Sequence, residues 1–221
     1  LNFLSGEEPC NAKTKGVNNS LLLLILLALE LGKMKAVVSE ETYQAYIEEI
    51  TASIEDIPAT IKKTKRRIEA HKEWSKIPHF YVIGNVTNVG IAEEAVLKIM
   101  ETLCIPGTVC ELGEFSHGVH RTIGPNSNVI TIQTEEAGHD IMEKTNSFLA
   151  NKAGKLLVVQ ATKEICEEDD VIPVPYRPLT ASCLNINVGF QVLATALPEL
   201  NGEDPNREIN EELTFSVKTR V

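Results

Sequence analysis

Hydrophobic residues in the first third of the chain recur at helical spacing. The segment 15–33 is apolar nearly all round, which predicts a buried helix. Ser39 is followed by two glutamates, and this capping signal predicts a second helix over 39–56. Pro58 favours the first turn of a third helix over 58–74. Because no strand pattern interrupts this stretch, we expect a helical connector with a domain boundary just after it.

After this connector the pattern alternates between short apolar runs and helical segments. The expected strands cover residues 80–83, 108–110, 129–132, 156–159 and, as an extended segment, 171–174. The expected helices cover residues 89–103, 111–121, 138–151 and 180–197. Strands separated by helices indicate a parallel sheet covered on both faces. We therefore expect a doubly wound α/β domain that binds its ligand at the carboxyl ends of the strands.

The run of leucines at 21–29 does not predict a membrane protein. It is shorter than the about 20 residues needed to span a bilayer. Glu30 follows it directly and no small-residue cleavage site comes after, which argues against a signal peptide. We expect this run to be buried in a large core or a dimer interface, with no membrane contact. Residues 1–4 are typical of the end of a strand, so the chain is expected to be N-terminally incomplete.

Charge excludes one class of function. The 221 residues carry a formal net charge of −10, without the broad cationic surface that a general nucleic-acid binder needs. A short basic run at 62–67, diluted by Glu69 and Glu73, predicts a solvated helix face. The five cysteines show neither a C-x-x-C pair nor zinc-type spacing, which favours reduced thiols in a cytoplasmic protein. No metal and no cofactor are predicted.

Two groups of residues could carry chemistry. Glu94, Lys98 and Glu101 share one face of the predicted helix 89–103, because they are four and then three residues apart. Taken alone, this helix favours solvated ion pairs, which contribute about 0.3–0.5 kcal/mol each. Glu114 and His117 follow the next strand, where a carboxylate and an imidazole can divide acid and base work near neutral pH.

The stretch 91–118 resembles the second sugar isomerase (SIS) domain in the isomerase half of glucosamine-6-phosphate synthases. The spacing from Glu101 to His117 equals that between the family's enolising glutamate and its ring-opening histidine. Residues 12–15, followed by a long apolar helix, are similar to the family's V-A-S-T-K loop and the last helix of its first SIS domain. The segment 202–219 resembles the family's C-terminal tail. The resemblance covers nearly the whole chain.

This resemblance implies a flavodoxin-like three-layer αβα fold, preceded by a helical remnant of a first SIS domain. The implied units are the end of a first SIS domain, a helical connector, a second SIS domain and a tail, at 1–38, 39–77, 78–200 and 201–221. Glu101 would shuttle a proton between C1 and C2 of an open-chain sugar phosphate. His117 would assist ring opening from the neighbouring subunit, which implies a homodimer. Lys98 and Glu94 would orient sugar hydroxyls or hold Glu101; a purely structural role stays open.

The chain departs from the family where the phosphate should bind. The family's S-x-S-G-x-T cradle is missing, and the corresponding place, 133–136, carries two acids that would repel a phosphate. Lys13 replaces a serine beside Thr14, and its cation could meet the phosphate instead. Phe215 aligns with the family's tail lysine, and Lys218 lies three residues later. These departures favour a relative that acts on another phosphosugar.

Three hypotheses therefore stand. The first is an enzyme, either a phosphosugar isomerase or a fructosamine-phosphate deglycase, since both begin by removing a proton next to a carbonyl or imine. The second is a non-catalytic sugar-phosphate sensor, which predicts ligand binding without turnover. The third is a fragment that folds and dimerises without activity.

Overall fold

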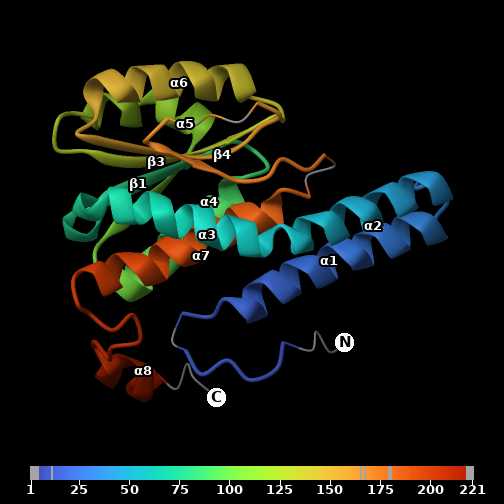
Figure 1. Ribbon diagram of the computed structural model, residues 1–221, viewed down its shortest axis with the longest axis horizontal. Helices are drawn as coiled ribbons and strands as arrows, with labels where there is room; N and C mark the ends of the chain where they lie inside the picture. Colours follow the sequence, from blue (N-terminus) through green and yellow to red (C-terminus); the bar gives the residue numbers. More distant parts are fainter. Residues whose placement is uncertain (1–4, 11, 165, 167, 179–180, 218–221) are drawn as a thin grey trace.

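The computed structural model describes residues 5–10, 12–164, 166, 168–178 and 181–217. At its centre lies a parallel sheet with the strand order β2-β1-β3-β4-β5 (Figure 1). The strands are β1 (Phe80–Gly84), β2 (Gly107–Glu111), β3 (Asn128–Thr134), β4 (Lys155–Ala161) and β5 (Val171–Pro173). This order is that of flavodoxin-like sheets. The predicted doubly wound α/β architecture is confirmed.

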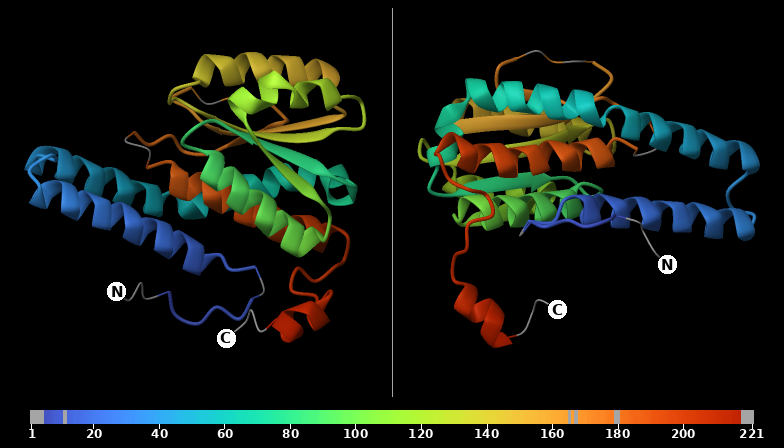
Figure 2. Two further views of the ribbon diagram at one scale, coloured as in Figure 1. Left: turned by 180° about the vertical axis from the view of Figure 1, so that it is seen from behind. Right: turned by 60° about the horizontal axis from the view of Figure 1, so that its bottom comes forward.

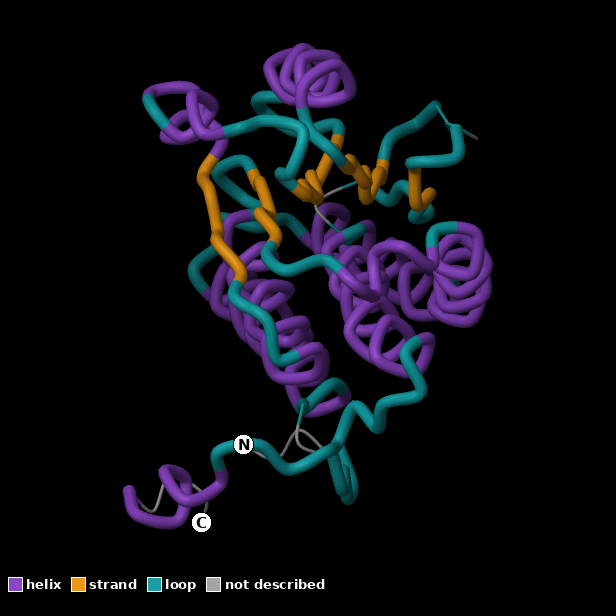
Figure 3. Tube along the Cα trace, turned by 90° about the vertical axis from the view of Figure 1, so that its left-hand side faces the viewer, coloured by secondary structure: helices purple, strands orange, loops and turns teal. Residues whose placement is uncertain are grey.

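Helices cover both faces of the sheet (Figure 3). One layer consists of α3 (Ile57–Ala70), α4 (Val89–Leu103) and α7 (Cys183–Leu200), and the other of α5 (Leu112–His117) and α6 (His139–Lys152). Two short 3-10 turns, η1 (Lys72–Lys76) and η2 (Val119–Thr122), follow α3 and α5. Because both faces are covered, all seven residues of β3 are buried, as is typical of a parallel sheet.

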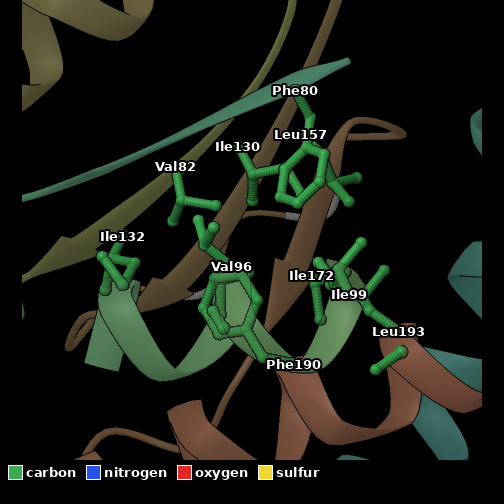
Figure 4. Close-up of a cluster of buried hydrophobic side chains, with 14 of the residues drawn as sticks. Phe80, Val82, Val96, Ile99, Ile130, Ile132, Leu157, Ile172, Phe190 and Leu193 are labelled. Carbon is green, nitrogen blue, oxygen red and sulfur yellow. The ribbon is translucent and has the colours of Figure 1, made fainter. Parts of the chain in front are cut away.

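The larger core lies between the sheet and the layer of α3, α4 and α7. Figure 4 shows Val96 and Ile99 of α4 together with Phe190 of α7 in this core. The strand side chains that pack with them are Phe80, Val82, Ile130, Ile132 and Leu157. This packing fixes the rotation of α4 about its axis, and so determines which of its side chains face away from the sheet.

The helix α1 (Lys15–Met34) corrects one prediction, because it is not buried. Together with α2 (Glu40–Glu55) it forms a hairpin that projects beyond the sheet (Figure 2). Leu29 is its one buried residue, while Leu24 and Leu31 are 62% and 46% exposed. Within one chain, α2 and α7 cover only part of this apolar helix.

Among the described residues, α1 is also the one helix long and apolar enough to cross a membrane, judged by length and composition alone. Core helices of soluble proteins pass the same test.

The predicted connector contributes to the folded layer. Its second helix, α3, places Thr60, Thr64 and Ile68 in buried positions against α7 and the sheet. Ser39 caps α2 as predicted, its hydroxyl accepting a hydrogen bond from the Thr42 N–H. The division of the chain into four units stays a prediction, and residues 1–4 lie outside the described part.

Candidate functional site

The helix that carries the paired glutamates begins at a tight turn after β1. Gly84 ends the strand, and a Cβ there would lie 2.8 Å from the Asn88 carbonyl oxygen, so the turn requires glycine. The Asn88 side-chain amide donates to Asn85 and to Thr134, which ties the turn to β3. The following helix, α4, spans the predicted residues, and its apolar side packs on the sheet.

On the other side of α4, one lysine joins two carboxylates. Lys98 Nζ lies 2.7 Å from Glu101 Oε2 and 3.6 Å from Glu94 Oε1. The Lys98 side chain is only 6% exposed, whereas those of Glu94 and Glu101 are 20% and 35% exposed. Solvated ion pairs do not bury a lysine to this extent. The structure therefore favours a partly desolvated charge cluster of Glu94, Lys98 and Glu101 over solvated surface ion pairs.

The two glutamates differ in their environments. Burial raises the pKa of Glu94, and the nearby Lys98 cation only partly offsets this effect. Glu94 Oε1 accepts no hydrogen bond from the described residues. Its 3.6 Å contact with Lys98 Nζ is therefore an ion pair that is too long for a hydrogen bond. In a single chain the better shielded carboxylate is Glu94.

A loop before α1 is organised by Glu8, which sequence reasoning missed. Its carboxylate accepts hydrogen bonds from the Thr14 N–H, the Thr14 hydroxyl, and the N–H groups of Lys15 and Gly16. Partial burial alone would raise the pKa of Glu8, but these bonds lower it to about 2. Glu8 therefore caps the N-terminus of α1 from a position seven residues before Lys15, the first residue of the helix. The only signal in the sequence is an acid shortly before a helix start.

Lys13 and Thr14, predicted to contact substrate, are held inside this loop. Lys13 Nζ donates to the Glu8 carbonyl oxygen at 2.6 Å, and both donors of Thr14 bind the Glu8 carboxylate. The loop also lies near the charge cluster. Burial and Glu8 raise the pKa of the Cys10 thiol, whereas Lys13 and Lys98 lower it.

The C-terminal tail is attached to the end of α4 by Arg207. Its guanidinium donates to the Thr102 carbonyl oxygen at 2.7 Å and to that of Leu103 at 3.2 Å, and it pairs with Glu203 at 3.0 Å. A cation at carbonyl groups that end a helix is favourable. The position aligned with the family's tail lysine lies in α8 (Glu211–Val217), and Lys218 lies outside the described residues.

His117 is not near Glu101 within one chain. It is the last residue of α5 and is exposed, and it has no hydrogen-bonding partner among the described residues. α5 covers the sheet face opposite α4 (Figure 1). It follows the carboxyl end of β2, whereas Glu101 lies near the end of α4, just before the amino end of β2. Glu114 is also exposed, and its backbone N–H donates to the Glu111 carboxylate. The two predicted catalytic groups thus meet only if another chain supplies one of them.

Three residues of the segment 133–136 make hydrogen bonds within the fold. The Gln133 side-chain oxygen accepts a hydrogen bond from Asn146, and the Thr134 carbonyl oxygen is bonded to His139. Glu135 accepts a hydrogen bond from the Lys163 N–H. Glu136 Oε2, by contrast, is buried and has no hydrogen-bond partner among the described residues.

No family model matches the chain. It is 28% identical over 212 residues to the isomerizing glutamine–fructose-6-phosphate aminotransferase of Fusobacterium nucleatum. This match covers 94% of the chain and 34% of the Fusobacterium protein. The corresponding enzyme of Thermococcus kodakarensis is 25% identical over 211 residues, covering 93% and 34%. The chain thus spans about a third of the length of these relatives.

A crystal structure from Clostridium difficile, described as a phosphosugar isomerase, superimposes on the chain with a TM-score of 0.86. It is 27% identical, and the match covers 99% of this chain and 62% of that one. The C-terminal domain of the glucosamine–fructose-6-phosphate aminotransferase of Francisella tularensis has a TM-score of 0.81 at 17% identity, covering 91% and 58%.

Proposed function

The chain belongs to the sugar isomerase (SIS) domain family, and from this premise we propose that it is part of a phosphosugar isomerase that works by proton transfer at Glu101. The observation that carries the proposal is the buried Lys98 ammonium between Glu94 and Glu101. Such a cation fixes one carboxylate oxygen of Glu101 and leaves the other available as a base. The relatives' names support action on a sugar phosphate.

The proposed reaction moves one proton between neighbouring carbons. In the open-chain aldose phosphate, the free Glu101 oxygen removes the proton from C2, and the electron pair forms a C1–C2 enediolate with its negative charge on the C1 oxygen. Glu101 then returns the proton to C1 while the hydroxyl proton passes from the C2 oxygen to the C1 oxygen, which gives the ketose. No atoms are gained or lost. A positioned base of this kind contributes about 10²–10⁴-fold to the rate.

We further propose that His117 of a second copy completes the site. An exposed histidine on the sheet face opposite α4 suits a role outside its own chain. It would move a proton between the ring oxygen and the hemiacetal oxygen before Glu101 acts. The homodimer and a cytoplasmic location belong to this proposal, as do substrate contacts of Lys13, Thr14 and Lys218. Neither nucleic acid nor a membrane is a proposed partner.

The test compares Glu101→Gln with Glu93→Gln, a matched control on the exposed side of the same helix. Fructose 6-phosphate, glucosamine 6-phosphate and a phosphorylated fructosamine are supplied separately, and turnover and deuterium uptake from solvent are followed by NMR. We expect Glu101→Gln to lower kcat by about 10²–10⁴-fold and the control to leave it unchanged. Full activity in Glu101→Gln contradicts the proposal. So does a wild-type protein that is stabilised by these ligands but turns over none, which is the behaviour of a sensor.

A further inference from the structure

The cations of the basic run on α3 fall into two groups in the structure. Lys63, Arg66 and Arg67 line a pocket of about 390 Å³, whereas Lys62 and Lys65 are exposed and lie outside this lining. The three lining residues share one side of the helix, because they are three and four positions apart. A solvated helix face accounts for the two outer lysines. It does not account for three cations around one hollow, which is called the basic pocket below.

The opposite wall of the basic pocket comes from β5 and the loop before it, through Pro173 and Asp169. The His71 ring fixes this loop to the end of α3, because His71 Nε2 lies 2.6 Å from the Asp169 carbonyl oxygen. α3 packs on α7 and β5, whereas α4 packs on α7, β1 and β2 at the other side of the sheet. The basic pocket is therefore separated by α7 from the charge cluster on α4.

The basic pocket holds more positive charge than the protein itself pairs. The Arg67 side chain is 14% exposed, and its Nη1 donates to Asp169 Oδ1 at 3.1 Å. A guanidinium has five N–H donors, so this contact uses only part of its capacity. Lys63 and Arg66 have neither an ion-pair nor a hydrogen-bond partner within the described ranges. Three cations thus share one carboxylate, in a chain whose net charge is −10.

The contact between Arg67 and Asp169 indicates what the basic pocket accepts. A carboxylate oxygen already occupies one donor position of the guanidinium, and a phosphoryl oxygen fits the same geometry. The Asp169 side chain is 95% exposed, so water screens this pair and an incoming anion can replace it at little cost. The volume falls within the range of about 300–1,000 Å³ typical of small-molecule sites, which is more than one phosphate fills.

We propose that the basic pocket binds the diphosphate group of a small molecule, which pairs with Lys63, Arg66 and Arg67 and displaces the Asp169 carboxylate. Two linked phosphoryl groups bring several oxyanions to cations that are spread over one helical turn. The site lies apart from the substrate site and goes beyond the proposed function. Inorganic pyrophosphate and nucleoside diphosphates share this chemistry.

Two substitutions in the lining should change the affinity in opposite directions. Arg66→Gln removes a cation, and Asp169→Asn removes the competing carboxylate; both positions are exposed, so the fold should be kept. Lys65→Gln is the matched control, because it removes the same charge from the same helix outside the lining. Titration calorimetry with inorganic pyrophosphate at low salt measures the dissociation constants. We expect Arg66→Gln to weaken binding about five- to tenfold, Asp169→Asn to strengthen it about two- to fivefold, and the control to stay within about twofold.

Inorganic phosphate and ADP are titrated in parallel, and phosphate should bind more weakly than pyrophosphate. Binding of ADP at least as tight as that of pyrophosphate assigns the basic pocket to a nucleotide, and weaker binding of ADP assigns it to inorganic diphosphate; either result supports a diphosphate site. Absence of binding, equal affinity for phosphate and pyrophosphate, or equal losses in Arg66→Gln and Lys65→Gln overturns it. Pyrophosphate that fructose 6-phosphate displaces, and that Arg66→Gln does not affect, occupies the substrate site and also overturns it. None of these results depends on turnover, so the proposed function stands or fails separately.

Discussion

Replacing Lys98 by methionine tests whether the charge cluster is built as described. Methionine is apolar and of comparable length, so the change removes the charge while leaving most of the packing volume. Removing one partner from a fully buried ion pair costs about 3–5 kcal/mol, because the remaining charge is left uncompensated. Here the two carboxylate side chains keep 20% and 35% exposure, and water therefore screens part of the loss. We expect Lys98→Met to lower the free energy of unfolding by about 2–3 kcal/mol at neutral pH.

The loss should depend on pH in a defined direction. The pKa of Glu94 is already raised by burial, and removing Lys98 raises it further. An acid whose pKa is higher in the folded than in the unfolded protein binds more protons when folded, so stability falls as the pH rises from the unfolded pKa through the folded one. The destabilisation should therefore be smallest near about pH 4 and largest near about pH 8.

Urea unfolding followed by circular dichroism at these two pH values measures the effect. For a chain of this length, the expected loss corresponds to a fall in Tm of about 5–10 °C. The double variant Glu94→Gln/Lys98→Met should recover about half of the loss, because it removes the desolvated charge. Lys65→Met, at an exposed position on α3, should stay within about 0.5 kcal/mol of wild type. A stable Lys98→Met protein with no pH dependence would refute the reasoning.

Three further outcomes are expected. Glu8→Gln should lower the free energy of unfolding by about 1–2 kcal/mol at neutral pH, because a helix cap is lost. The carboxylate stabilises the fold above its ordinary pKa of 4.5, and this contribution disappears as the pH falls towards about 2. Urea unfolding should therefore show that the stabilities of the two proteins converge in acid. Arg207→Ala should release the tail from α4, seen as faster proteolysis and amide exchange after residue 200, whereas unchanged exchange would show that Arg207 does not anchor it. If His117 acts in a second copy, mixing and reassociating inactive Glu101→Gln and His117→Ala proteins should restore about a quarter of the activity. About half of the dimers are then mixed, and each of these contains one intact site out of two. No recovery of activity in demonstrated heterodimers contradicts the shared site.

Much of the fold followed from local patterns. The helix over 89–103 was predicted with the bounds that the structure shows, because its apolar positions repeat at helical spacing. The same spacing placed Glu94, Lys98 and Glu101 on one side of it. Periodicity could not show that the lysine is buried between the carboxylates, since burial depends on how α4 packs on the sheet.

Other features were out of reach of the sequence because they join distant residues. The apolar sequence of α1 predicted burial, yet neighbours cover only part of this helix in the described structure. The contact of Arg207 with the carbonyl groups that end α4 spans more than a hundred residues. Neither periodicity nor capping rules relate positions that are so far apart.

The sequence by itself determined the order of strands and helices, the charged face of α4 and the resemblance that connects Glu101 with His117. Those features depend on short-range spacing. The tertiary structure decided that Lys98 is shielded, that Glu94 rather than Glu101 is the more desolvated acid, and that His117 lies across the sheet from Glu101. Solvent exposure and relative position are set by packing between elements that meet only when the chain has folded, and no local pattern records them.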